Sequence, residues 1–140
     1  MSNTKEQKDQ KLGGRTRTLT KTDLFKQAIQ GPCFVKVGAT WCRPCKQFKP
    51  TYQAIANVNS KIKFLDIDAD NDSDVLDYIR SLPSAFPTET GKIEVKTVPA
   101  ILLFLKGKHR ATTKSNESAM AKDALEHFGI TLSLPKQQDK

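Results

Sequence analysis

Cysteine is scarce in this sequence, and the small number limits what this residue type can do. The 140 residues contain three cysteines, Cys33, Cys42 and Cys45. A small secreted domain stabilised by disulfides has more cysteines, in an even number, so the count excludes a disulfide scaffold. One close pair in an intracellular chain indicates redox chemistry or metal binding instead.

Long hydrophobic runs are also absent. The longest apolar run, Ala100–Leu105, has the length of a buried strand and is too short to span a membrane. The first residues lack the apolar core of a secretory signal, and Glu6 and Asp9 argue against a transit peptide. We therefore expect a soluble protein of the cytoplasm.

The excess of positive charge is spread along the chain. The net charge is +8, from 23 basic and 15 acidic residues, and no nucleic-acid-binding motif accompanies it. We expect neither a nucleic-acid nor a membrane partner. Residues 1–18 are basic and poor in large apolar groups, which predicts a flexible N-terminal tail. A domain over 19–134 and a short tail over 135–140 account for the rest.

Hydrophobic periodicity and turn residues predict alternating helices and strands. The expected elements are a helix after Thr20, a strand over 33–37, a helix over 43–57, a strand over 62–67, a short helix after Asp72, a loop over 81–92, a hairpin over 101–113 and a last helix ending at Gly129. A strand–helix–strand connection gives a parallel pair, and the hairpin adds antiparallel strands. The pattern predicts an α/β fold with a central mixed β-sheet flanked by helices.

Cys42 and Cys45 fall where a predicted helix begins, directly after an apolar strand. A cysteine at this helix N-terminus is close to free N–H groups and to the positive end of the helix dipole. Arg43 and Lys46 add positive charge, and Pro44 suits the first turn because its missing N–H is harmless there. These features predict an exposed nucleophilic Cys42 with a pKa below the value of about 8.5 of free cysteine, and Cys45 as the resolving thiol.

The stretch Trp41-Cys42-Arg43-Pro44-Cys45-Lys46 resembles the W-C-G-P-C-K active site of the thioredoxin family. Thr97-Val98-Pro99, ahead of a strand, is similar to the cis-proline motif of that family. The resemblance covers about residues 19–130 and implies the thioredoxin fold. It implies that Cys42 and Cys45 are catalytic and that Trp41, Arg43, Pro44 and Lys46 support them. It also implies that Val98 and Pro99 bind the backbone of an extended substrate.

Lys36 departs from the family pattern. Thioredoxins carry a buried aspartate on the strand, six residues before the nucleophile, and Lys36 occupies that position. A cationic Lys36 can stabilise a Cys45 thiolate by its charge, whereas a buried neutral lysine can act as a base. In a third interpretation, the side chain extends to solvent and has no role.

Two further departures concern Arg43 and the loop over 81–93. Arg43 between the cysteines favours the reduced thiolate, which predicts a couple more oxidising than that of thioredoxin. The loop makes the separation between Asp68 and Pro99 roughly double that of the family, so the fold is expected to have a longer loop before the cis-proline. We expect this loop to lie near Pro99, where it either selects partners or is a neutral insertion.

Two metal-binding alternatives fit the sequence poorly. A zinc site would need Cys33, His109 or His127 in addition to the close cysteine pair, and none of them has ligand spacing. The aspartate-rich stretch 66–74 is similar to a calcium-binding loop but lacks its glycine at the sixth position and its glutamate at the twelfth. We therefore expect no metal site.

The resemblance implies a thiol–disulfide oxidoreductase that reduces protein disulfides and needs no bound cofactor. The expected partners are disulfide-containing protein substrates and a thioredoxin-reductase-like electron donor, and the protein is expected to be a monomer. The alternative is a thioredoxin-like binding or scaffold subunit. In that case the fold and the 81–93 loop hold a partner, and the redox activity is secondary.

Overall fold

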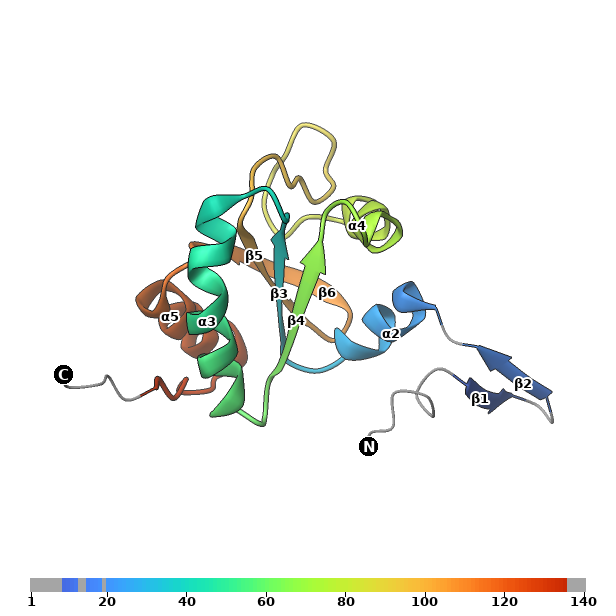
Figure 1. Ribbon diagram of the computed structural model, residues 1–140, viewed down its shortest axis with the longest axis horizontal. Helices are drawn as coiled ribbons and strands as arrows, with labels where there is room; N and C mark the ends of the chain where they lie inside the picture. Colours follow the sequence, from blue (N-terminus) through green and yellow to red (C-terminus); the bar gives the residue numbers. More distant parts are fainter. Residues whose placement is uncertain (1–8, 13–14, 19, 136–140) are drawn as a thin grey trace.

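A mixed four-stranded sheet forms the centre of the computed structural model, which describes residues 9–12, 15–18 and 20–135 (Figure 1). Its strands are β3 (Cys33–Gly38), β4 (Lys63–Asp68), β5 (Ala100–Leu105) and β6 (Lys108–Thr113). The order across the sheet is β4-β3-β5-β6. β3 is parallel to β4 and antiparallel to β5, and β5 is antiparallel to β6. The predicted central mixed sheet is therefore confirmed.

Helices cover both faces of this sheet. They are α2 (Lys21–Ala28), α3 (Arg43–Asn57), α4 (Ser73–Arg80) and α5 (Glu117–Phe128). Figure 1 shows α3 and α5 on one face and α2 and α4 on the other. Local signals set the helix ends: Thr20 and Asp23 form a capping box at α2, and Gly129, with φ of 69°, ends α5. None of the helices among the described residues is long and apolar enough to cross a membrane.

Alternation along β3 distributes its side chains between the two faces. Cys33, Val35 and Val37 belong to the core cluster that includes residues of α2 and α4. Phe34 belongs to the second cluster, with residues of α3 and α5. Lys36 follows Phe34 by two positions, so its side chain projects toward the α3 face. Cys33 is thus directed away from the face that carries α3.

The loop over 81–93 is held at the start of β6. The backbone N–H of Ala85 donates to Nδ1 of His109 at 3.1 Å, and the ring of Phe86 lies 5.5 Å from the His109 ring. His109 pairs with Phe104 and lies level with Cys33, at the amino end of β3. The cysteine motif follows the opposite, carboxyl end. The expectation that the loop lies near the cis-proline is therefore wrong for its Ala85-Phe86 stretch.

A two-stranded antiparallel hairpin precedes α2. It pairs β1 (Asp9–Leu12) with β2 (Arg15–Thr18), in a segment for which the sequence predicted no regular structure. A Gly-Gly pair between the strands, with β-branched threonines in β2, was the signal for this hairpin. The rest of the predicted N-terminal tail and most of the C-terminal tail lie outside the described residues. The domain boundaries therefore stay a prediction.

Candidate active site

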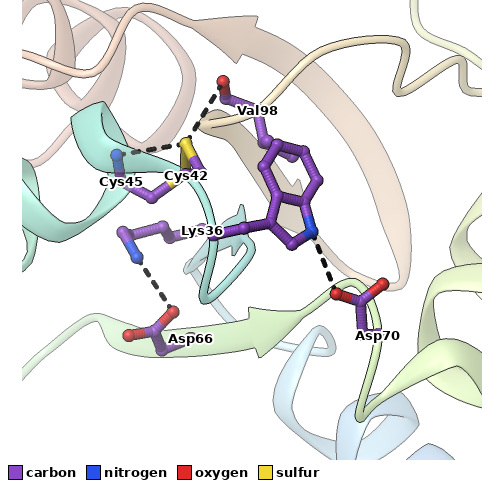
Figure 2. Close-up of a disulfide and its surroundings, with 7 residues drawn as sticks. Lys36, Cys42, Cys45, Asp66, Asp70 and Val98 are labelled. Atoms are coloured by element: carbon purple, nitrogen blue, oxygen red, sulfur yellow. Dashed lines mark hydrogen bonds and ion pairs between the residues drawn. A yellow bond between two sulfur atoms is a disulfide. The ribbon is translucent and has the colours of Figure 1, made fainter.

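The close cysteine pair lies at the beginning of α3. Cys42 is the N-cap residue, Cys45 lies in the first turn, and a disulfide joins them with their Cα atoms 5.3 Å apart. The Cys42 sulfur accepts a hydrogen bond from the backbone N–H of Cys45 at 3.2 Å (Figure 2). This sulfur takes the place of the side-chain oxygen in an ordinary N-cap, so it faces the positive end of the helix.

Both cysteines are buried in this disulfide form. Cys42 is 5% exposed and Cys45 is 3% exposed, and they form a small cluster with Ala39 and Val98. The sequence predicted an exposed Cys42, and its burial is a correction. Cys45 is bonded to Cys42, and Val98 packs against this cluster from the segment that leads into β5. A partner must therefore approach the sulfur alongside Val98.

The Val98–Pro99 segment faces the cysteine pair. The peptide bond between these residues is cis, as the resemblance implied. The carbonyl oxygen of Val98 lies 3.7 Å from the Cys42 sulfur (Figure 2). Backbone polar groups of the segment before β5 therefore lie next to the atom that would be attacked.

Lys36 lies beneath the disulfide and is paired with a carboxylate. Its residue exposure is 3%, so the interpretation that it extends to solvent is wrong. Its Nζ donates to Oδ1 of Asp66 at 3.1 Å, and Figure 2 shows the side chain lying between the cysteines and β4. The sequence did not predict Asp66 as the partner of Lys36, because only the register of β3 and β4 places the two residues opposite each other.

Gly38 makes room for Lys36 and Cys45 to be neighbours. A β-carbon at Gly38 would lie 3.3 Å from Nζ of Lys36 and 3.3 Å from Sγ of Cys45. A pocket of about 510 Å³ opens beside these groups, and Asp66 is among its lining residues. Cys45, the buried ammonium of Lys36 and the carboxylate of Asp66 therefore share one open recess.

Trp41 is the most prominent apolar side chain on the surface beside the cysteines. It is 70% exposed, and its indole Nε1 donates to Oδ2 of Asp70 at 3.1 Å (Figure 2). Sequence reasoning considered Asp70 only as part of a calcium loop. Asp70 follows β4 and Trp41 follows β3, so parallel strand ends bring them together.

Arg43, Pro44 and Lys46 complete the exposed surface around the helix start. All three are exposed, and Pro44 lies in the first turn of α3, as predicted. The two cations lie within the first turn of α3, on the same helix end as Cys42. The surface available to a partner is thus apolar at Trp41 and Pro44 and positive at Arg43 and Lys46.

The arrangement of the cysteine pair and the cis-proline lies within a match to a known protein family. The family model described as Thioredoxin matches residues 15–129, which include the cysteine pair and Pro99. The chain belongs to the thioredoxin family. Family, fold and the disulfide-forming pair together identify a thiol–disulfide oxidoreductase.

Curated thioredoxins are similar to part of the chain. Thioredoxin of Callithrix jacchus is 30% identical over 89 residues, covering 61% of this chain and 71% of that protein. Thioredoxin of Homo sapiens is 33% identical over 73 residues, covering 52% of this chain and 56% of that protein. The chain thus spans little more than half the length of several of these relatives.

Solved thioredoxin structures share the fold. Fasciola hepatica thioredoxin superposes with a TM-score of 0.58 at 19% identity, covering 74% of this chain and 88% of that one. Malassezia sympodialis thioredoxin gives a TM-score of 0.58 at 24% identity, covering 75% and 84%. The thioredoxin architecture is therefore kept although most side chains differ.

Asp72, in the acidic run that follows β4, has structural partners. The backbone N–H of Asp68 donates to Asp72 at 2.8 Å, and Lys21 pairs with the other oxygen of the same carboxyl group. Burial acts to raise the pKa of Asp72, but the hydrogen bonds from Lys21 and from the Asp68 backbone lower it overall. These partners connect α2 to the start of α4.

Cys33 does not join the close cysteine pair. It is fully buried on the α2 and α4 face, and burial raises the pKa of its thiol to about 12. Among the described residues, the side chains that could hold a metal together are Asp123, Glu126 and His127 on α5. This group includes no cysteine, so it gives no support to the zinc alternative at Cys42 and Cys45.

Proposed function

We propose that the protein reduces disulfides of protein substrates, with Cys42 as the nucleophile and Cys45 as the resolving thiol. The observation that carries this proposal is the place of the Cys42 sulfur as the N-cap of α3. The helix N-terminus stabilises a thiolate there, while Cys45 lies close enough to form the disulfide.

The reaction consists of two thiol–disulfide exchanges. The Cys42 thiolate attacks one substrate sulfur, forms a mixed disulfide and releases the other substrate sulfur as a thiolate. Cys45 then attacks the Cys42 sulfur, which forms the Cys42–Cys45 disulfide and releases the second substrate thiolate. The substrate gains two electrons and two protons, and the protein loses them. The chemistry needs no bound cofactor, because the thiol pair carries the electrons.

The surface around Cys42 suits an extended peptide. Val98 and Pro99 present backbone next to the sulfur, and a substrate strand can align there. Trp41 offers an exposed apolar contact, while Arg43 and Lys46 favour acidic or neutral partners. We assign substrate binding to Val98 and Pro99, and supporting roles to Trp41, Arg43, Pro44, Lys46 and Lys36.

Turnover requires an electron donor and a reducing compartment. We infer that a thioredoxin-reductase-like enzyme reduces the Cys42–Cys45 disulfide after each cycle. A monomer in the cytoplasm fits this reaction, since thiol pairs are kept reduced there.

Reduction of insulin disulfides tests the proposal. The wild-type protein should accelerate reduction by dithiothreitol, and Cys42→Ser should abolish the acceleration. Cys45→Ser should trap mixed disulfides with substrate that are visible by mass spectrometry. Cys33→Ala is the control and should retain the activity. If the double variant Cys42→Ser, Cys45→Ser is as active as wild type, the proposal is wrong and the scaffold alternative gains support.

A further inference from the structure

Lys36 and Asp66 form a pair across two neighbouring strands. They are directly opposite each other in the parallel β3–β4 register. Asp66 follows Phe64 by two positions, and Phe64 packs with the α3 and α5 cluster, so both members of the pair face α3. Their Nζ and Oδ1 atoms are 3.1 Å apart, with side-chain exposures of 4% for Lys36 and 35% for Asp66.

An ammonium group as buried as that of Lys36 needs a partner. Removing one member of a buried ion pair leaves an uncompensated charge in a poorly solvated place, which is strongly unfavourable. Asp66 supplies that partner at hydrogen-bond distance. Lys49 also approaches Asp66, at 3.9 Å, but its side chain is 55% exposed, so water screens its charge. The carboxylate therefore acts mainly on Lys36.

The ammonium lies beside the resolving sulfur. Nζ of Lys36 and Sγ of Cys45 both lie 3.3 Å from the position that a β-carbon on Gly38 would occupy. The two atoms are therefore neighbours, at most 6.6 Å apart, and a positive charge so close to a sulfur favours the thiolate over the thiol. The pocket of about 510 Å³ that Lys36, Cys45 and Asp66 line gives water access to the same place. A proton that leaves Cys45 can therefore reach solvent.

We propose that Asp66 is a positioning residue that holds the Lys36 ammonium beside Cys45, so that the resolving thiolate forms in the mixed disulfide. The proposal rests on the proposed function, because it concerns the second exchange step. In that step the Cys45 thiol gives its proton to water, and its sulfur bonds to Cys42. The bond from Cys42 to the substrate breaks, and the substrate sulfur leaves with the electron pair. Lys36 keeps its proton throughout.

The pair is therefore a unit whose two charges depend on each other. Lys36→Asp alone, which places the family residue on β3, would set two carboxylates opposite each other on β3 and β4. Like charges at this distance repel, and neither would help a Cys45 thiolate to form. Combining Lys36→Asp with Asp66→Lys restores an opposite-charge pair with reversed polarity. It also places a buried carboxylate at the position where the family has one.

Stopped-flow reaction with equimolar dithiobis-nitrobenzoate (DTNB) separates the two steps. Attack by Cys42 releases a first thionitrobenzoate, and attack by Cys45 on the mixed disulfide releases a second. Both phases are recorded from about pH 5 to about pH 9, so that the thiol titrations are covered. The single variants are Asp66→Asn, Asp66→Glu, Lys36→Met and Lys36→Asp. The double variants combine Lys36→Met with Asp66→Asn, and Lys36→Asp with Asp66→Lys; the second of these is the charge-swapped variant. Lys63→Met, an exposed lysine on β4, is the matched control.

The second phase should change and the first should not. Asp66→Asn and Lys36→Met should each slow the second phase about tenfold at neutral pH, because a smaller fraction of Cys45 is then thiolate. Lys36→Met combined with Asp66→Asn should be no slower than either single variant. Asp66→Glu and the charge-swapped double variant should recover to within about threefold of wild type, since an opposite-charge pair is restored.

Different outcomes identify different errors. Absence of the first phase in the wild-type protein would show that the cysteine pair does not attack a disulfide, which overturns the proposed function. A normal first phase with a second phase unchanged by Asp66→Asn would overturn the role of Asp66 alone. If Asp66→Asn slows both phases equally without moving the pH midpoint of the second, Asp66 is merely structural. If Asp66→Asn does not fold, failure of the charge-swapped variant to exceed Lys36→Asp overturns the proposal.

Discussion

Ala85 and His109 connect the 81–93 loop to the sheet through one hydrogen bond. The backbone N–H of Ala85 donates to Nδ1 of His109, so the proton of the neutral ring is on Nε2, which lies 3.0 Å from Oγ1 of Thr112. The ring also packs between Phe86 and Phe104. A protonated ring would have hydrogens on both nitrogens and could not accept from Ala85. The loop is therefore held by the neutral form of His109.

This contact makes stability depend on pH. Burial lowers the pKa of His109 from its ordinary value of 6.5. Below pH 6.5 the unfolded chain binds the proton more readily than the folded one, so the free energy of unfolding should decrease as the pH falls toward the lowered pKa. Above 6.5 this contribution should be constant. Urea unfolding at a series of pH values measures the effect.

A histidine at another place provides the control for this prediction. His109→Gln should remove the pH dependence below neutrality that is specific to this ring, whereas His127→Gln on α5 should keep it. Hydrogen exchange of the Ala85 amide should accelerate at acid pH in the wild-type protein. A pH dependence that is the same in wild type and His109→Gln contradicts the prediction.

The three cysteines should differ in reactivity in the reduced protein. Cys33 is fully buried with a pKa raised to about 12 by burial, so almost none of it is thiolate near neutral pH. Cys42 faces the N-terminus of α3 and should be alkylated first, with Cys45 slower. Brief treatment with iodoacetamide and mass mapping give the order. Labelling of Cys33 in the native state, or of Cys45 before Cys42, would contradict it.

Local sequence signals were sufficient to predict most of the elements. The capping box at Thr20, the proline in the first turn of α3 and the glycine at the end of α5 each specify a helix end within a few residues. The apolar run over 33–37 likewise predicted the central strand β3. These features depend on neighbours in the sequence, so they can be read without a structure.

Contacts between distant segments could not be predicted in this way. Asp66 lies 30 positions after Lys36, and only the register between their strands shows that they pair. The contact of Ala85 with His109 likewise depends on how the inserted loop packs against β6. The contact of Cys42 with Val98 joins residues more than 50 positions apart. The sequence thus predicted the reacting atoms, whereas their electrostatic partners required the fold.

Arg43 should raise the redox potential of the cysteine pair. It is exposed at the first position of α3, where its fixed charge favours the Cys42 thiolate and hence the reduced form. We expect a potential above the value of about −270 mV of thioredoxin, and nearer to the range of about −200 to −230 mV of glutaredoxins. Arg43→Gly should lower it by about 30 mV, which corresponds to about 1.4 kcal/mol.

Titration in glutathione buffers measures this potential. Lys122→Gln, a change of charge on the exposed side of α5, should leave the potential unchanged and controls for net charge. A wild-type potential below that of thioredoxin, or no difference between wild type and Arg43→Gly, is incompatible with the assigned effect of Arg43.

Asp70 should matter for protein substrates more than for small ones. Its carboxylate accepts the indole N–H of Trp41, which is otherwise 70% exposed. Without this bond the indole would sample several orientations, and ordering it again on substrate binding costs free energy. A hydrogen bond at an exposed site contributes at the lower end of the usual range, so Asp70→Ala should lower kcat/KM for insulin about two- to fivefold.

The first-phase rate with DTNB should stay unchanged, because a small reagent does not contact the indole in a defined orientation. Asp77→Ala, an exposed carboxylate on α4, should leave both rates at their wild-type values. An equal loss of both rates in Asp70→Ala would show that Asp70 acts on the Cys42 sulfur itself and not through the orientation of Trp41.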